Sequence, residues 1–307
     1  MSRPSPVLNV MIQAARKAGR GLARDFGELE HLQVSKKGPA DFVTAADLKA
    51  EAILYEELSK ARPGYGFLLE ERGAVTGTDR SHRFIIDPLD GTLNFMHALP
   101  QFAISIALER DGELQSGLVF NPATDDLFWA EKGSGAFWND RRLRVSARRR
   151  LDESVIATGI PFRGREGHAT FLGEMERVMQ EVAGIRRFGS AALDLAYVAA
   201  GKFDGFWERG LKAWDIAAGL VLVREAGGFT RDIGSGNRGA SQPDQALMNG
   251  DILATNASLL EDMTKLLSTA GPRLTAVERA RENERARENE RARAKEAAMG
   301  AEKDAGE

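Results

Sequence analysis

Hydrophobic positions in the first half of the chain follow a helical period and then a strand period. Apolar residues recur every three or four positions from residue 7 to residue 23, which predicts a helix. A second helix is predicted to begin after Thr44, a residue type that caps helices, and to end near residue 61. Beyond it, short or alternating apolar runs are typical of strands, and those from residue 102 onwards favour an antiparallel sheet. The predicted strands are 64–69, 83–86, 102–108, 114–120, 126–131, 135–138 and 143–145.

The second half of the chain alternates strands with helices. Strands are predicted at 155–160, 203–207, 229–232 and 252–254, and helices at 169–182, 190–200, 214–226 and 258–267. This order favours sheets covered by layers of helices, an α+β or layered α-β fold. We expect one domain with two halves, 1–150 and 151–271. Residues 272–307 repeat charged residues and alanine, so we interpret them as a solvated low-complexity tail.

Composition excludes several classes of function. The chain has no cysteine, so disulfides, thiolate nucleophiles and cysteine-ligated zinc are excluded. With a net charge of −3, the chain as a whole lacks the excess of positive charge that is typical of nucleic-acid-binding proteins. No run approaches the roughly 18 uninterrupted apolar residues of a membrane span, and no signal-peptide pattern opens the chain. We therefore expect a cytoplasmic protein that has no membrane partner.

Acidic residues stand at the edges of several apolar runs, namely Asp47, Glu70, Glu71, Asp87, Asp90 and Asp215. We expect Pro88 to end the strand before it, because proline cannot donate a ladder hydrogen bond, and Thr92 to begin a helix. Asp87 and Asp90 would then meet beside a helix N-terminus. Paired carboxylates repel each other unless a cation lies between them, and oxygen ligands favour Mg²⁺, Mn²⁺ or Ca²⁺. Since helix N-termini bind phosphate, the pattern indicates metal-assisted phosphoryl transfer to water.

The same residues also have simpler interpretations. Taken alone, the stretch DPLDG at 87–91 is more typical of a turn than of a metal site. Asp47 is also explained as a residue of a helix start, and Glu71 as a solvated neighbour of Glu70. The choice depends on the motifs elsewhere in the chain.

Two motifs far apart in the chain decide between these interpretations. The first is DPLDGT at 87–92, and the second is WDIAAG at 214–219 followed by EAGG at 225–228. Together with DFVTAAD at 41–47 they resemble the signatures of the inositol monophosphatase family, close to its bacterial SuhB type. The segment GSAA at 189–192 and the pair Trp207-Glu208 resemble the substrate segments of that family. The similarity runs from about residue 36 to residue 256, so the tail lies outside it.

The resemblance implies an α-β-α-β-α sandwich that uses metal-activated water to hydrolyse myo-inositol monophosphate to inositol and phosphate. It implies two to three Mg²⁺ ions per site, with Asp87 shared between the first two. The implied metal ligands are Glu70, Asp87, the carbonyl of Leu89, Asp90 and Asp215. The implied catalytic residues are Glu70, Thr92 and Asp47, where Asp47 orients Thr92 and Thr92 aligns the attacking water. The implied substrate-binding residues are Asp90, Gly91, Thr92, Gly189, Ser190, Ala191 and Glu208.

Several readings of the function stay open within this resemblance. Members of the family are usually homodimers and are often inhibited by lithium. The same metal core also serves phosphatases of other sugars, polyols and nucleotides, and the fold does not choose among them. SuhB-type relatives are associated with transcription complexes, so a regulatory binding protein is a further alternative. Two residues depart from the family pattern. Ser190 stands where threonine is common, which bears on substrate choice. Leu69 stands where glycine is common, which bears on the loop that carries Glu70.

Overall fold

The computed structural model describes residues 3–28, 34–38, 41–234 and 245–268, with only the backbone for 34–38, 41–42 and 245. The tail predicted at 272–307 lies outside the described residues. Eight α-helices are found in the described part of the chain. They are α1 Pro6–Phe26, α2 Ala45–Ala61, α3 Thr92–Met96, α4 His168–Glu181, α5 Ala191–Ala199, α6 Ala213–Glu225, α7 Gln245–Asn249 and α8 Leu260–Ser268.

The larger sheet has eight strands in the order β10-β9-β8-β7-β6-β5-β3-β4. Its strands are β3 Gly66–Leu69, β4 Gly73–Val75, β5 His82–Asp90, β6 Ala103–Arg110, β7 Glu113–Asn121, β8 Asp126–Glu131, β9 Gly135–Trp138 and β10 Arg141–Arg142. All neighbours are antiparallel except β3 and β5, which run parallel. The predicted antiparallel sheet is therefore confirmed from β6 onwards.

The smaller sheet has five strands in the order β12-β11-β13-β15-β14. They are β11 Val155–Thr158, β12 Gly184–Arg186, β13 Gly205–Glu208, β14 Phe229–Asp232 and β15 Ile252–Thr255. Strands β12, β11 and β13 are parallel, and β15 is antiparallel to both of its neighbours. A separate hairpin joins β1 Val34–Gly38 to β2 Asp41–Thr44.

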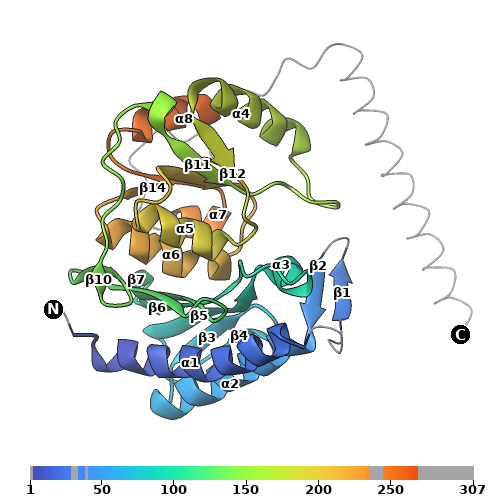
Figure 1. Cartoon of the computed structure of the whole chain (residues 1–307). Helices are drawn as coiled ribbons and strands as arrows, with labels where there is room; N and C mark the ends of the chain where they lie inside the picture. The colour runs from blue at the N-terminus through green and yellow to red at the C-terminus, as the bar shows by residue number, and fades with distance from the viewer. Residues whose placement is uncertain (1–2, 29–33, 39–40, 235–244, 269–307) are drawn as a thin grey trace, which may run out of the picture.

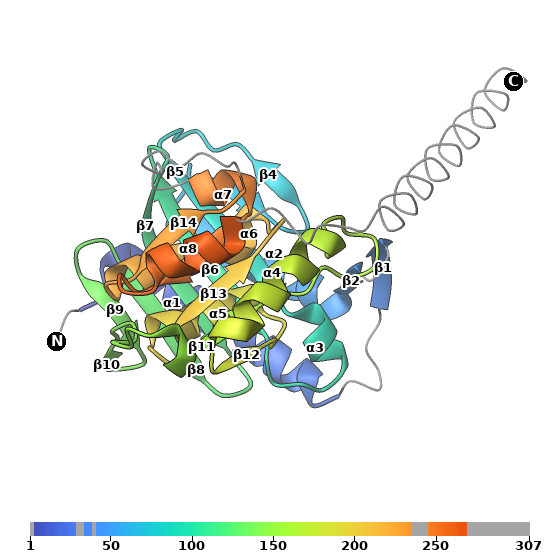
Figure 2. The same ribbon diagram turned by 90° about the horizontal axis from the view of Figure 1, so that it is seen from above.

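The helices and sheets stack in five layers (Figure 1). Helices α1 and α2 cover one face of the larger sheet, α5 and α6 lie between the two sheets, and α4 and α8 cover the outer face of the smaller sheet. Figure 2 shows α4 and α8 side by side over that face. The α-β-α-β-α sandwich implied by the resemblance is confirmed.

The central helices are apolar on every side because sheets cover both of their faces. Every residue of α6 from Ile216 to Val223 is buried, as expected for a helix enclosed by protein. Close approach also requires glycine here. A Cβ on Gly219 would lie 2.4 Å from Leu195 of α5, and one on Gly117 of β7 would lie 2.5 Å from the Ala218 carbonyl oxygen. These two positions hold α6 tightly against both neighbours.

Some local predictions were wrong. Pro88 does not end its strand, because β5 continues to Asp90 and takes the proline into a bulge, where no ladder hydrogen bond is needed. The strand predicted at 143–145 is absent, and β10 lies at Arg141–Arg142 instead. The short strands β4 and β12 and the short helix α7 were not predicted, since three to five residues carry too little periodicity.

Candidate active site

The bulge at the end of β5 brings Asp87 and Asp90 to one side of the sheet. The register with β6 pairs Asp87 with Ser105 and then Asp90 with Ala103, so β5 holds one extra residue in this interval. In a regular strand, side chains three residues apart lie on opposite faces, and one extra residue reverses that parity. The two carboxyl groups are coupled electrostatically, in agreement with this geometry.

Glu70 reaches the same place through the parallel pairing of β3 with β5. Leu69, the last residue of β3, pairs with Ile86, so Glu70 lies beside Asp87 of β5. The Glu70 backbone N–H donates to the Ile86 carbonyl oxygen at 3.2 Å. The Glu70 side chain also forms a hydrogen bond with Asp87. Glu70, just after β3, and Asp87 of β5 are thereby brought side by side.

Three of the acids occupy the first turn or the N-terminus of a helix. Asp47 lies in the first turn of α2, and its Oδ2 accepts from the Thr44 backbone N–H at 2.9 Å and from the Thr44 hydroxyl. Asp215 lies in the first turn of α6 and accepts from the Lys212 N–H at 2.7 Å. Asp90 accepts from the Ser190 hydroxyl at 2.5 Å and from the Ala192 N–H at 2.8 Å, at the start of α5. The N-terminus of a helix stabilises a nearby negative charge, so each of these three carboxylates lies where a helix favours its ionised form.

Burial nevertheless makes these carboxylates resist ionisation. Desolvation raises the pKa of Asp87, which is 3% exposed, well above its ordinary value, and the charges of Glu70, Asp90 and Asp215 add to the shift. Desolvation likewise raises the pKa of Asp215 well above its ordinary value and that of Asp90 to about 6. A cation bound among them would remove the mutual repulsion, which is the main cost after desolvation.

The donor set of this cluster fits a hard divalent cation. It consists of carboxylate oxygens together with the Leu89 carbonyl at the bulge, and Leu89 itself has a buried side chain. Among the described residues, no group of three or more aspartate, glutamate or histidine side chains is placed so that it could hold a metal ion as it stands. A cation of the Mg²⁺ type would therefore have to draw these acids together on binding.

Thr92 stands between this cluster and Asp47. Its hydroxyl lies 3.1 Å from Asp47 Oδ1 and 3.0 Å from the Leu89 carbonyl oxygen. A hydroxyl has one hydrogen, so it donates to one of these acceptors at a time. Desolvation raises the pKa of Asp47 to about 6, against the hydrogen bonds from Thr44 that lower it. Above that pH Asp47 is an ionised acceptor for the Thr92 hydroxyl.

Two glycines allow the metal-motif segment and the loop before α5 to approach each other. Gly91 has φ of +93° and caps α3, and a Cβ there would lie 2.9 Å from the Gln101 carbonyl and 3.3 Å from the Gly189 carbonyl. Gly189 has φ of +82°. Gly91 therefore lies against Gly189, the residue that precedes Ser190 and the buried first residue of α5, Ala191.

Glu208 ends β13, close enough to the bulge that, besides desolvation, the charge of Asp90 raises the pKa of its carboxyl group. Its carboxyl group lies over Gly159, where a Cβ would come within 2.1 Å of the carboxyl oxygens. Desolvation raises its pKa to about 7, opposed by the positive charges of Arg165 and Arg187. Asp194 of α5 is a further buried acid nearby, and its pKa is raised by desolvation and by the charges of Glu208 and Asp90.

Sequence reasoning missed two residues that hold these parts together. The Asn94 amide donates to the Gln101 and Phe188 carbonyl oxygens, each at 2.7 Å, and so ties α3 to the loop before Gly189. The buried Ser105 donates to the Trp214 carbonyl oxygen at 3.1 Å and fixes the start of α6 beside β6. Asn94 lies just after the DPLDGT motif, so its position could have suggested a role. No local sequence pattern distinguishes Ser105.

The sequence matches the inositol monophosphatase family over residues 3–271. The chain belongs to this family. The inositol-1-monophosphatase of Rhizobium meliloti (strain 1021) is 64% identical over 268 residues, which cover 87% of this chain and 98% of that protein. The Nus factor SuhB of Escherichia coli (strain K12) is 43% identical over 258 residues, which cover 84% of this chain and 94% of that protein.

A solved structure also resembles the protein. The crystal structure of extragenic suppressor protein suhB from Bartonella henselae has a TM-score of 0.81 and 57% identity, and the match covers 87% of this chain and 100% of that chain. As a member of the inositol monophosphatase family, the protein is an enzyme of the phosphatase class. Among the described helices, none is long and apolar enough to cross a membrane.

Proposed function

We propose that the protein is a Mg²⁺-dependent phosphomonoesterase that hydrolyses myo-inositol monophosphate to inositol and phosphate. The observation that carries the proposal is that the charges of Glu70, Asp90 and Asp215 all act on the buried Asp87, in a chain of the inositol monophosphatase family. These four side chains and the Leu89 carbonyl would hold the two to three ions. Bound Mg²⁺ supplies charge neutralisation, a lowered pKa of bound water and stabilisation of the leaving alkoxide.

The residues around the metal site would then orient the reactants. When the Leu89 carbonyl is engaged in the site, Asp47 is the remaining acceptor for the Thr92 hydroxyl. The Thr92 oxygen would then accept a hydrogen bond from the attacking water and align it; as the water loses its proton to Thr92, Thr92 would pass its own proton to Asp47, with help from Glu70. The backbone N–H groups of Gly91 and Thr92 would bind the phosphate.

The alcohol part of the substrate would lie between Glu208 and the start of α5. Glu208 and Asp90 offer carboxylate acceptors to ring hydroxyls, while Gly189, Ser190 and Ala191 line the facing wall. Hydroxyl recognition by buried acceptors discriminates strongly against substrates that lack the hydroxyl, because the acceptors are then left unpaired. This supports a polyol phosphate as the substrate.

A substrate panel tests the proposal. The full chain would be assayed for phosphate release from myo-inositol 1-phosphate, other sugar and polyol phosphates, and nucleotide phosphates, with Mg²⁺, with Mg²⁺ plus Li⁺, and with a chelator. We expect hydrolysis of the inositol ester that needs Mg²⁺ and is inhibited by Li⁺, and none by Asp215→Asn. Preference for another phosphate ester would overturn the substrate assignment, and Mg²⁺-independent activity would overturn the metal assignment.

We also propose that the protein forms a homodimer. Leu172 and Met179 stand two turns apart on α4 with exposed fractions of 63% and 58%, and Ile160 and Phe188 are exposed in nearby loops. Apolar surface of this kind is typical of protein interfaces. Light scattering is expected to give the molar mass of a dimer for the wild type and that of a monomer for the Leu172→Glu, Met179→Glu double variant. A monomeric wild type would contradict the proposal.

A second candidate function is regulatory binding to the transcription machinery. It is favoured by the 43% identity to the protein named Nus factor SuhB. Binding of the full chain to purified RNA polymerase, alone and with its transcription factors, tests it; no binding at micromolar concentration would exclude this role. A cytoplasmic location, expected from the cysteine-free composition, stays a prediction.

A further inference from the structure

Arg209 follows Glu208 directly and begins the connection between β13 and α6. That connection therefore joins the proposed substrate residue Glu208 to the proposed metal ligand Asp215. The path of this connection as it leaves β13 affects the position of the Glu208 side chain, the last of the strand. The residues that anchor Arg209 are consequently part of how the pocket is built.

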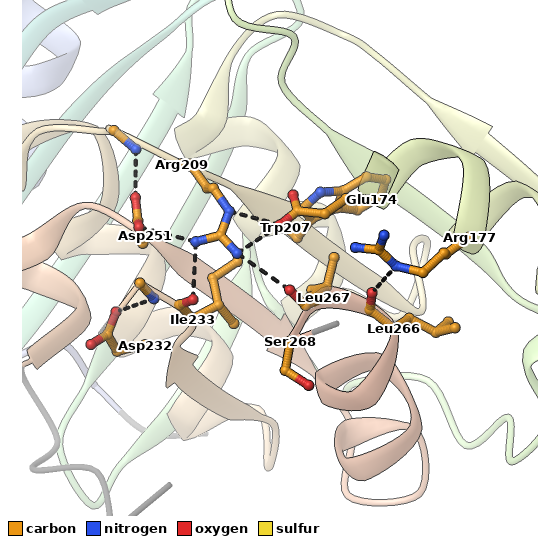
Figure 3. A network of polar contacts seen from close by, with 12 residues as sticks. Glu174, Arg177, Trp207, Arg209, Asp232, Ile233, Asp251, Leu266, Leu267 and Ser268 are labelled. Carbon is orange, nitrogen blue, oxygen red and sulfur yellow. Dashed lines mark hydrogen bonds and ion pairs between the residues drawn. The ribbon is translucent and has the colours of Figure 1, made fainter. Parts of the chain in front are cut away.

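The Arg209 guanidinium is held by groups from four separate segments (Figure 3). Nε and Nη2 donate to Glu174 Oε1 of α4 at 2.8 and 2.6 Å. Nη1 donates to Asp251 Oδ2 at 3.1 Å and to the Ile233 carbonyl oxygen after β14 at 2.9 Å. Nη2 also approaches the Leu267 carbonyl oxygen of α8 at 3.5 Å. A planar fork that uses all three nitrogens in this way cannot be replaced by a lysine ammonium.

Glu174 and Asp251 are the two acids that accept hydrogen bonds from Arg209. Glu174 is 1% exposed, and its second oxygen, Oε2, has no hydrogen-bond partner among the described residues. Its charge is therefore compensated by Arg209, and a buried charge without a partner would be costly. Asp251 also holds the connection by a second route, because its Oδ1 accepts from the Gly210 backbone N–H at 2.8 Å. The chain leaving β13 is thus fixed by both side-chain and backbone bonds.

Glu208 itself depends on this anchoring. Within the described residues its carboxyl group makes no hydrogen bond, and it rests on Gly159. Strand pairing with Ile252 of β15 sets its backbone register on one side, and Arg209 restrains the chain on the other. A carboxylate that lacks hydrogen bonds of its own is aimed by the backbone that carries it.

We propose that Arg209, held by Glu174 and Asp251, is a positioning residue that aims Glu208 at the polyol part of the substrate and so sets selectivity for the alcohol. The inference rests on the proposed function and deepens it. The hydrogen bonds of Arg209 go to Glu174, Asp251 and two backbone carbonyls and not to the acids of the bulge or Thr92, so hydrolysis of an ester without ring hydroxyls should not need it. The alternative is that Arg209 only stabilises the fold, in which case its loss affects all substrates alike.

The test compares kcat and KM for myo-inositol 1-phosphate and for p-nitrophenyl phosphate, which has no ring hydroxyls. Arg209→Lys is expected to raise KM for the inositol ester about tenfold, a loss typical of a misplaced binding group, while kcat and KM for the aryl ester stay within about twofold. Arg177→Lys is the matched control. Arg177 lies on α4 and donates to the Leu266 carbonyl at 2.6 Å without reaching the connection, so neither substrate should be affected.

The Glu208→Gln background separates positioning from general stability. There, Arg209→Lys is expected to leave the ratio of kcat/KM for the two esters unchanged, because the side chain it aims has lost its charge. If Arg209→Lys does not fold, Asp251→Asn, which weakens the same anchor, serves in its place. An equal loss for both esters, or a selectivity change that persists without Glu208, would overturn the inference. If the wild type hydrolysed neither ester, the proposed function itself would fail.

Discussion

A hydrogen bond between Asp47 of α2 and Thr92 of α3 links the two helices. Asp47 Oδ2 is engaged by Thr44, so only Oδ1 faces Thr92, at 3.1 Å. Whenever the hydroxyl donates to Asp47 and not to the Leu89 carbonyl, a lone pair of the Thr92 oxygen is left for a water molecule. Thr44 and Asp47 together form the capping box of α2, so a helix start also serves as an orienting device.

Replacing Thr92 by alanine tests this role. We expect Thr92→Ala to lower kcat for myo-inositol 1-phosphate by about 10²- to 10⁴-fold, the range of positioned acid-base groups, with little change in KM. Thr92→Ser keeps the hydroxyl and is the matched control, expected to retain most of the activity. Steady-state kinetics at saturating Mg²⁺ measures both. A Thr92→Ala variant within twofold of wild-type kcat would remove Thr92 from the mechanism.

At the scale of elements, the pocket is assembled where α3, α5 and α6 begin. Asn94 is 6% exposed and bridges α3 to the loop that precedes α5 through two carbonyl oxygens. Asp90 then joins the end of β5 to the first turn of α5. The two bridges together hold the end of β5 and α3 against the loop before α5 and the first turn of that helix.

Loss of the Asn94 amide should loosen this junction. Asn94→Ala leaves two partly buried carbonyl groups without this donor, so we expect the free energy of unfolding to fall by about 1–3 kcal/mol. Asn249→Ala is the control, since that exposed amide donates only to Asp232, and its change should stay within about 0.5 kcal/mol. Urea denaturation measures both. Equal effects of the two substitutions would contradict the bridging role.

At the scale of the whole molecule, the sandwich buries acids that prefer to be protonated. The pKa values of Asp47 and Asp90 rise to about 6 and that of Glu208 to about 7, in each case chiefly through desolvation. Between the pKa values of the unfolded and folded states the folded protein binds more protons, so its stability falls as pH rises. Surface carboxylates with lowered pKa, such as that of Asp79, at about 2, act in the opposite sense but below this range.

Thermal unfolding at different pH values tests this linkage. With a chelator present, we expect Tm to fall as pH rises from about 5 to about 7.5, the interval spanned by the raised pKa values. Mg²⁺ should raise Tm more at the upper pH, where the acids are ionised to receive it. Asp87→Asn removes one of the crowded charges and should reduce the fall. A chelated wild type whose Tm rises over this interval would contradict the prediction.

Much of the fold followed from local patterns. Helical periodicity predicted α1, α2, α4, α5, α6 and α8 to within about three residues of the observed bounds, and Thr44 was predicted as a cap and is one. The short elements β4, β12 and α7 were missed, because they exist through pairing and packing with distant segments. The strand β5 was predicted too short, since the bulge that carries it past Pro88 depends on its partner β6.

The sequence by itself determined which residues could form the site and what chemistry they favour. The acids, their spacing and the two motifs are local properties, and oxygen donors without cysteine point to a hard cation in any fold. The tertiary structure alone decided that Asp87 and Asp90 share a face, that Glu70 joins them across β3 and β5, and that Arg209 anchors the chain after Glu208. The reason is physical, because strand register, burial and desolvation arise between segments that are far apart in the chain.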